Sequence, residues 1–326
     1  KARSTEEECW GFIINELKEL APDLPLKWDS DNSGRATQKA AYGLLSRVAL
    51  YAEKWDVAAQ AARDCATAEG NLDLSKNGYA KIFELGINSP EVLFAVEFKS
   101  SVIDHAYDAY VRPSGDTKEL GKQVYSGFVP TSELVDSYEM AGDGGNFSWE
   151  KHGKDPYANR EPRFYATILY NGADWMGRKI ESFVGGKDGY KAYENAGAAG
   201  TTVTGYYLRK YLIDGDKTWV TSGSGQDWIV LRYAEVLLNK AEALAMENWN
   251  KNSAEALQAL NDVRARVGLP ARATADKETF LEYVRHERKV ELAGEGFRYW
   301  DLRRWRLAEK VIDGQNVHGV KISKQS

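Results

Sequence analysis

The sequence has little cysteine and little histidine, and neither is spaced for metal binding. Among 326 residues there are two cysteines, Cys9 and Cys65, and four histidines. The cysteines form no CxxC pair and no Cys/His ligand spacing, so neither a disulfide framework nor a structural zinc site is predicted. The segment "HERKV" at His286 begins like the metalloprotease pattern HExxH, but Val290 replaces the second histidine. Zinc hydrolysis is therefore not expected.

Common catalytic and nucleotide-binding motifs are also missing. No GxSxG elbow is present, and "GDTKELGKQ" has the wrong gap between glycines for a phosphate loop, with Gln123 where Ser or Thr would hold magnesium. The formal net charge of −5 gives no overall basic field, so nucleic acid is not an expected partner. No apolar run reaches about 18 residues, and the N-terminus has no apolar signal core. The charged start within an expected helix suggests that a further segment precedes it.

What the sequence does contain is typical of a folded protein with a proper core. Hydrophobic residues make up 43% and charged residues 28%, the balance of a soluble globular chain. Aromatic residues make up 12%, with 18 Tyr and 10 Trp against 10 Phe. Tyr and Trp combine a flat apolar face with a polar edge. Their excess therefore needs a structural or functional explanation.

Apolar periodicity predicts a helical framework. Residues 4–20 are predicted to form an amphipathic helix that ends at Pro22 and Pro25, with its apolar residues on one buried face. A helical hairpin is expected from about 37 to 70, closed by Gly70, and Ala58 and Cys65 have the seven-residue spacing of small residues in a tetratricopeptide repeat. The apolar residues of the first helix are Trp10, Ile13, Ile14, Leu17 and Leu20.

A second hairpin is expected at 227–268, where Ala256 and Val263 repeat that spacing, followed by a helix for which Asp276 is a plausible N-cap. Between the hairpins the chain is rich in Gly and aromatics, with short candidate strands in "EVLFAVEF", "YATILY" and "GYYLRKY". The prediction is one mostly α-helical domain over 1–326, with helix pairs at about 4–70 and 226–310 and a loop-rich part with short strands at about 71–225. Loops on a rigid scaffold are where binding groups tend to lie.

Two segments resemble half of a calcium-binding loop. "DSDNSG" at Asp29 matches the first half of an EF-hand loop, but Ala40 replaces the bidentate glutamate. "DLSKNGYAKIFE" has Asp73, Asn77, Gly78 and Glu84 at matching positions, but Ser75 at the third. The alternative for both is a turn before a helix, where these residue types are favoured anyway. No cofactor is predicted, and calcium is the alternative that these two segments leave open.

The acidic residues near the C-terminal helix offer a hydrolytic alternative. Glu291 and Glu295 would share a helix face, and glycosidases use two carboxylates about 5–10 Å apart. The competing interpretation is that the carboxylates pair with neighbouring arginines and fix a helix end, which keeps them ionised and unsuited to a general acid. That structural interpretation is favoured. It involves Glu287, Glu291, Glu295 and Asp301 with Arg285, Arg288, Arg298, Arg303 and Arg304.

Several segments together resemble one known family. "LRYAEVLLNKAEAL", "LNDVRARVGL" and "RHERKVELAGEGFRYWDLRRW" are similar to signature segments of SusD/RagB-type nutrient-binding outer-membrane lipoproteins. "GRATQKAAYGLLSRVALYAEKW", "YAKIFELGINSPEVLFAVEF", "PTSELVDSYEMAGDG", "YANREPRFYATILYNGADW" and "GYYLRKY" resemble further family segments in the same order. The resemblance extends from about Ser4 to Lys310. The lipidated cysteine and N-terminal part of the family pattern are not in this sequence, and its C-terminal tail is shorter.

The resemblance implies a fold, a role and partners. The fold would be mostly α-helical, with tetratricopeptide-like helix pairs and a loop-rich ligand-binding part. The role would be non-catalytic capture of oligosaccharides or polysaccharides, or in some branches peptides, at the cell surface. The implied partner is a SusC-like TonB-dependent transporter of the outer membrane, and the implied membrane attachment is only through an N-terminal lipid anchor.

Loops with Trp and Tyr beside Asn, Asp and Gly predict where such a ligand binds, because sugars stack on aromatic faces while amides and carboxylates bind their hydroxyls. Trp175 and Tyr190 are equally consistent with loop packing, and Tyr170 alternates with Ile168 in a probable buried strand. Tryptophans on or beside helices are expected to pack; these are Trp10, Trp28, Trp55, Trp249, Trp300 and Trp305. The predicted ligand-binding residues are Trp175, Tyr190, Tyr193, Asp174, Asn171, Trp149 and Trp219.

Overall fold

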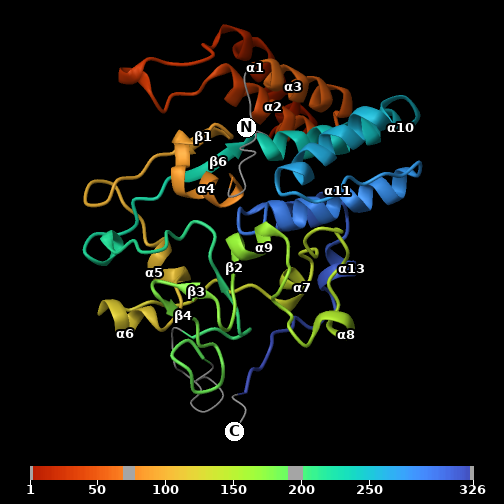
Figure 1. The fold of residues 1–326 in the computed structure, drawn as a ribbon. Helices are drawn as coiled ribbons and strands as arrows, with labels where there is room; N and C mark the ends of the chain where they lie inside the picture. The colour runs from red at the N-terminus through yellow and green to blue at the C-terminus, as the bar shows by residue number, and fades with distance from the viewer. Residues whose placement is uncertain (1–2, 69–77, 190–200, 324–326) are drawn as a thin grey trace. The chain divides into compact units, whose positions relative to one another are not determined.

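Small residues at the predicted spacing allow close packing of helix pairs. The computed structural model describes residues 3–68, 78–189 and 201–323. Ala58 and Cys65, and likewise Ala256 and Val263, are fully buried. Figure 1 shows α2 (Gln38–Tyr51) beside α3 (Trp55–Thr67), and the two halves of α10 (Tyr233–Arg266) beside each other. The predicted mostly α-helical fold with tetratricopeptide-like pairs is confirmed.

The chain divides into two compact units, each with its own core. Unit 1 comprises Lys1–Val96 and Trp228–Leu292, and unit 2 comprises Glu97–Asp227 and Ala293–Ser326. Unit 1 contains α1 (Glu6–Leu20), η1 (Ala21–Asp23), η2 (Ser30–Asn32), α2 (Gln38–Tyr51), α3 (Trp55–Thr67), α4 (Gly78–Leu85), η3 (Gly86–Asn88), β1 (Val92–Val96), β6 (Trp228–Arg232), α10 (Tyr233–Arg266) and α11 (Lys277–Glu291). The division into one domain with a scaffold and an insert stays a prediction.

The first helix begins as its sequence predicts but buries less than expected. The Thr5 side chain accepts the Glu8 N–H, and the Glu8 carboxylate accepts the Thr5 N–H, which completes a capping box. Of the five apolar residues predicted to form a buried face, only Ile14 is buried, and Ile13 and Leu20 are exposed. The expectation that all five lie on one buried face was wrong, because the main contacts of α1 are with α2 and η1 and the other four side chains stay half-buried or exposed.

The long helix α10 is two helices. Asn248 has φ −164° and ψ 93°, which interrupts the helix and separates the two halves of the predicted hairpin. Its predicted start was wrong, because residues 228–232 form strand β6, antiparallel to β1, with Ile229 opposite Ala95. Ile229 and Leu231 are buried, which fits the preference of β-branched and apolar residues for a paired strand. Asp276 caps α11 as predicted by accepting the Thr279 N–H.

Unit 2 is built from short elements joined by loops, as the high Gly content predicts. Its described strand pairs are antiparallel: β2 (Ile168–Leu169) pairs with β5 (Tyr207–Leu208), and β3 (Asp174–Trp175) pairs with β4 (Arg178–Lys179). The first pair confirms strands in "YATILY" and "GYYLRKY", although the first three residues of "YATILY" belong to a helix. No helix within the described ranges is both long and apolar enough to cross a bilayer. The elements are α5 (Tyr107–Val111), α6 (Asp116–Leu120), α7 (Ser132–Val135), α8 (Trp149–His152), α9 (Pro162–Thr167), β2 (Ile168–Leu169), β3 (Asp174–Trp175), β4 (Arg178–Lys179), β5 (Tyr207–Leu208), η5 (Thr218–Val220), α12 (Phe297–Arg304) and α13 (Ala308–Ile312).

One helical tryptophan does not pack as expected. Trp300 on α12 is 54% exposed, and its neighbour Tyr299 is 57% exposed. The prediction that Trp300 is a packing residue was wrong, because α12 has only eight residues and buries just Asp301 and Leu302. Its other side chains are half-buried or exposed.

Candidate functional site

Two of the predicted ligand tryptophans lie in the core of unit 2. Trp175 and Trp219 are 0% and 1% exposed. The guanidinium of Arg112 lies between them, 5.2 Å from the Trp175 ring centre and 5.1 Å from the Trp219 ring centre, within the range of cation–π attraction. Arg112 also pairs with Asp108 at 2.6 Å and with Asp116 at 3.3 Å. Neither indole has an exposed face for a ligand in this structure.

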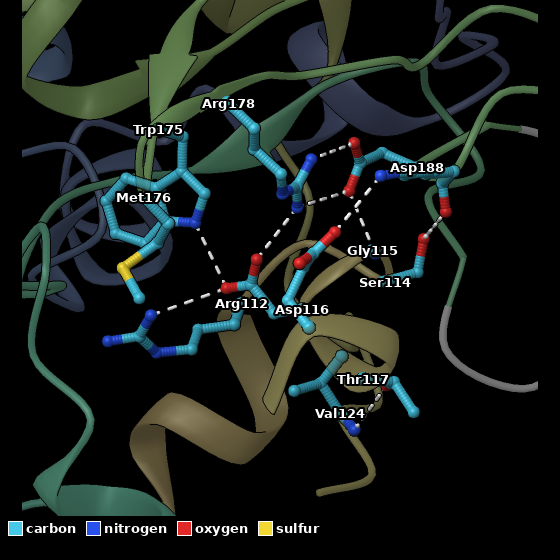
Figure 2. A network of polar contacts seen from close by, with 12 residues as sticks. Arg112, Ser114, Gly115, Asp116, Thr117, Val124, Trp175, Met176, Arg178 and Asp188 are labelled. Carbon is cyan, nitrogen blue, oxygen red and sulfur yellow. Dashed lines mark hydrogen bonds and ion pairs between the residues drawn. The ribbon is translucent and has the colours of Figure 1, made fainter. Parts of the chain in front are cut away.

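Asp116 connects this core to the β3–β4 hairpin (Figure 2). The Trp175 indole N–H donates to Asp116 at 3.0 Å, and Arg178 donates to Asp116 at 2.8 Å and to Asp188 at 2.6 Å. Burial lowers the pKa of Arg178, but the hydrogen bonds and charges of Asp188 and Asp116 raise it above its ordinary value overall. A Cβ on Gly115 would lie 2.5 Å from the Asp188 carboxylate, so only glycine fits there. The network is a rigid support, not an open site.

Tyr207 joins Asp188 of this network to Thr202, and these two residues lie on either side of the segment that contains Tyr190 and Tyr193. The Tyr207 hydroxyl donates to the Asp188 carbonyl at 2.7 Å and accepts the Thr202 N–H at 3.2 Å. Tyr190 and Tyr193 lie outside the described residues, so their predicted role is not tested. Asp174 lies on the β3–β4 hairpin with its side chain 85% exposed, where it pairs with Lys179 at 2.7 Å.

The remaining two predicted residues, Trp149 and Asn171, come together in one pocket. Its volume is about 550 Å³, within the usual range for small-molecule sites. Trp149 is 44% exposed, so the indole presents part of its surface to solvent. The pocket is lined by Trp149, Pro156, Tyr157, Asn171, Val320, Lys321, Ile322 and Ser323.

Trp149 is held in a fixed orientation. It is the first residue of α8, whose N-cap Ser148 accepts the Lys151 N–H. The indole N–H donates to Asp136 at 2.9 Å, and the ring packs edge-on against Phe147 with centroids 5.4 Å apart. An aromatic ring restrained at both its polar edge and one side loses little conformational entropy when a ligand stacks on it.

Tyr157 forms a second aromatic wall that the sequence interpretation missed. Its ring packs against Tyr170 with centroids 4.4 Å apart, and Tyr170 stacks on Phe164 at 5.3 Å. Burial raises the pKa of Tyr157 above its ordinary value, so its hydroxyl stays protonated. The Asp-Pro-Tyr sequence before Asn159 is a turn signal like those around the residues that were selected, and could have indicated Tyr157.

The buried side chain of Arg160 holds the backbone next to Tyr157 in place. Arg160 donates to the carbonyls of Val135, Tyr138 and Pro156, at 2.6, 2.8 and 3.0 Å. Its guanidinium lies 4.1 Å from the centre of the Phe147 ring. Burial lowers the pKa of Arg160. The side chain thereby connects α7 to the turn that carries Pro156 and Tyr157.

Asn171 supplies a polar group that is not used within the described chain. Its Oδ1 atom is buried and accepts no hydrogen bond from any described residue. A buried acceptor without a donor costs roughly 1–3 kcal/mol. A ligand hydroxyl that entered the pocket and donated to this oxygen would remove that cost.

The C-terminal segment closes the pocket, and no side-chain pattern indicated this. The Val320 N–H donates to the Thr204 carbonyl at 2.8 Å, and the Val184 N–H donates to the Ile322 carbonyl at 2.8 Å. These bonds join backbone groups, which every residue except proline offers equally. Sequence patterns therefore contain no signal for this wall.

The glutamates of the hydrolytic alternative are buried and paired. Glu291 is 0% exposed and accepts from Arg232 at 2.6 Å and from Arg266. Glu295 accepts from Lys210 at 2.7 Å, and its side chain is 3% exposed. The predicted structural pairing of Asp301 with Arg304 is found at 2.8 Å, whereas Arg232, Arg266 and Lys210 were not predicted as partners. These carboxylates form internal clamps without access for a sugar.

The described residues contain no group of three or more His, Cys, Asp or Glu side chains arranged for a metal ion. In the first calcium candidate, Asp29 accepts the N–H groups of Asp31 and Asn32, as an ordinary turn cap does. In the second, residues 73–77 lie outside the described residues.

Known proteins with the same architecture define the class. A structure of a SusD-like protein from Bacteroides fragilis superposes with a TM-score of 0.85 at 29% identity, covering 98% of this chain and 64% of that one. A second from the same species, described as a SusD-like carbohydrate-binding protein, has a TM-score of 0.81 at 27% identity and covers 97% and 61%. The fold is therefore that of the SusD-like proteins.

The family is established by sequence. The sequence model of the SusD family matches residues 90–326, and this chain belongs to that family. A SusD-like protein of Bacteroides ovatus is 25% identical over 94% of this chain and 53% of its own length. SusD-like protein P38 of Formosa agariphila is 32% identical over 38% of this chain and 25% of its own length. The chain thus spans about half or less of these two curated relatives.

Proposed function

We propose that this chain is a non-catalytic binding protein that captures an oligosaccharide or polysaccharide in the pocket between Trp149, Tyr157 and Asn171. The observation that carries the proposal is the half-exposed Trp149 ring, oriented by Asp136, beside the unused Asn171 oxygen. A sugar ring presents C–H groups to an aromatic face and hydroxyls to an amide, and this pocket offers both. The carbohydrate-binding description of a structural relative from B. fragilis supports the same ligand class.

Family membership also supports a proposal for the wider role of the protein. We propose that the captured glycan is passed to a SusC-like TonB-dependent transporter in the outer membrane, and that the whole protein is attached at the cell surface by an N-terminal lipid. Support comes from the SusD family match over residues 90–326. Binding without hydrolysis is consistent with the paired and buried state of Glu291 and Glu295.

The decisive experiment is a calorimetric titration of the purified protein against neutral polysaccharides, oligosaccharides and peptides. Trp149→Ala should weaken binding of the best glycan about tenfold or more, because a central aromatic anchor commonly contributes that much. Asn171→Ala should weaken it as well, through loss of the polar contact. Trp28→Ala is the matched control, since Trp28 also has a hydrogen-bonded indole but does not line the pocket.

The outcomes separate the alternatives. Equal binding by wild type and Trp149→Ala would remove the pocket from the proposal. Binding of a peptide, but of no glycan, would favour the second candidate, a peptide-capturing member with the same fold. Release of reducing ends on long incubation, abolished by Glu295→Gln, would instead favour the glycosidase alternative.

A further inference from the structure

A second groove lies on the short helices near the C-terminus, and its lining differs from that of the Trp149 pocket. It has a volume of about 530 Å³ and lies at the end of α12 and the start of α13. The exposed rings of Tyr299 and Trp300 adjoin each other, with centroids 5.0 Å apart and planes at 82°. The groove is lined by Tyr299, Arg303, Arg306, Ala308 and Glu309.

The two arginines of the groove lack carboxylate partners within the described part of the chain. Among the described residues, neither Arg303 nor Arg306 forms an ion pair with a carboxylate, although neighbouring Arg304 pairs with Asp301 at 2.8 Å. Both are exposed. Glu309 also lines the groove, so two guanidinium groups face one carboxylate and the lining has an excess of positive charge. The chain as a whole has a net charge of −5, so this local charge has the opposite sign.

Arg303 is oriented in advance. Its Nη1 donates to the Tyr299 hydroxyl at 2.8 Å, and the guanidinium lies 5.5 Å from the centre of that ring. The hydrogen bond uses only part of the five-donor fork of arginine. The remaining donors suit the two oxygens of a carboxylate or sulfate group, which arginine binds in a bidentate manner.

Arg306 occupies a backbone position that ordinarily favours glycine. Its φ is 56°, in the left-handed region, and it follows the C-cap of α12. Helices commonly end with glycine there because a Cβ is unfavourable. An arginine in this conformation lowers local stability but places a guanidinium at the groove. Unfavourable backbone conformations of this kind are common at binding sites.

We infer that the groove formed by Tyr299, Arg303 and Arg306 is a second ligand site, for an acidic saccharide whose uronate carboxylate or sulfate ester binds the two guanidinium groups. The exposed rings of Tyr299 and Trp300 supply faces for the sugar ring beside the charged group. The site shares no lining residue with the Trp149 pocket. The proposed function then includes two ligand sites, one for neutral sugars and a second that selects acidic saccharides.

The test compares three probes by calorimetry at low salt: a galacturonic acid trimer, its carboxyl-reduced trimer, and a sulfated galactose trimer. At least one acidic trimer should bind more tightly than the reduced one. Arg303→Ala and Arg306→Gly should each weaken that binding about tenfold, the effect of losing a charge-assisted hydrogen-bond donor. The melting temperature of Arg306→Gly should be unchanged or higher, because glycine tolerates the left-handed backbone.

Matched variants exclude simpler explanations. Arg35→Ala removes another exposed arginine next to a tryptophan, with its guanidinium 5.6 Å from the Trp28 ring centre, and should leave acidic binding unchanged. Trp149→Ala should also leave it unchanged, so failure of the neutral pocket and failure of this groove are distinguishable. Arg303→Lys, which keeps the charge but loses the fork, should retain only part of the affinity.

Each result decides something. Preference for the uronate or for the sulfated trimer supports the site and identifies the acidic group. Equal binding of acidic and reduced trimers overturns it, as does equal binding by wild type and the Arg303→Ala and Arg306→Gly variants. An equal loss in Arg35→Ala would show that only general surface charge is involved, and would also overturn it.

Discussion

The tryptophans of unit 2 differ in role because their tertiary environments differ, although their neighbours in the sequence are similar. Trp149 and Trp175 both follow loop residues rich in Asp, Asn and Gly, and both indoles donate to an aspartate. Trp149 is 44% exposed and Trp175 is 0% exposed. Trp175 packs within an apolar core cluster and against the buried guanidinium of Arg112, whereas Trp149 lies at the edge of a pocket. One ring is therefore available to a ligand and the other is not.

We expect Trp175→Ala to lower the free energy of unfolding by about 3–5 kcal/mol, the usual range for emptying a large buried aromatic site. The change also removes the donor to Asp116 and one of the two rings that cover Arg112. Urea denaturation followed by circular dichroism measures the effect. Trp149→Ala should lose clearly less stability, and equal losses in the two variants would contradict this division of roles.

At the scale of elements, the helix pairs are held together by packing of small residues and by a few bridging charges. Glu255 on α10 accepts from Arg63 on α3 at 2.7 Å and from Lys240 on the preceding half of α10 at 2.8 Å. The hydrogen bond from Arg63 is the largest cause that lowers the pKa of Glu255, from 4.5 to about 2. The bridge thus joins two helices that are far apart in sequence.

The lowered pKa predicts how stability depends on pH. The stabilising effect of Glu255 is fully present above about pH 4.5 and is lost as the pH falls towards about 2, because the unfolded state binds the proton first. Glu255→Gln should therefore flatten the acid dependence of unfolding in that window, as measured by urea midpoints at several pH values. Arg63→Gln should flatten it in part, because Lys240 still pairs with Glu255, and an unchanged slope in both variants would disprove the bridge. The magnitude is small because both side chains are more than one third exposed.

At the scale of the whole molecule, charge separates the two proposed sites. The chain has a net charge of −5, so it gives an acidic saccharide no general attraction. We propose that the Trp149 pocket binds through stacking and neutral hydrogen bonds, whereas the α12–α13 groove binds through guanidinium groups that have no carboxylate partner among the described residues. Salt should therefore affect the two sites differently.

Raising NaCl from about 0.1 M to about 1 M shortens the Debye length from about 10 Å to about 3 Å. Affinity for a neutral glycan should change less than about twofold, because no ion pair forms on binding. Affinity for an acidic trimer should fall severalfold over the same range. Titrations of one protein preparation at both salt concentrations provide the measurement, and a strong salt dependence for the neutral glycan would be inconsistent with the stacking pocket.

Local patterns in the sequence determined the framework of this protein. The seven-residue spacing of Ala58 and Cys65, the cap at Asp276 and the strand "EVLFAVEF" each depend on residues that are near in the chain, and each is found as predicted. Trp149 and Asn171 were selected from residue type alone and lie in one pocket, while their role in ligand binding stays a prediction. Family membership could also be predicted from the sequence, because the motifs and their order along the chain can be recognised without a structure.

Only the tertiary structure decided which aromatic rings face solvent and what completes each site. The Trp175 ring packs against Arg112, which lies more than sixty positions earlier in the chain. The pocket wall at 320–323 is joined to Thr204 and Val184 by backbone hydrogen bonds, which no side-chain pattern predicts. Likewise, Arg303 was expected to pair with a carboxylate at the helix end, and the structure shows that it has no carboxylate partner among the described residues. Burial and pairing depend on long-range contacts, which residue types and spacing do not encode locally.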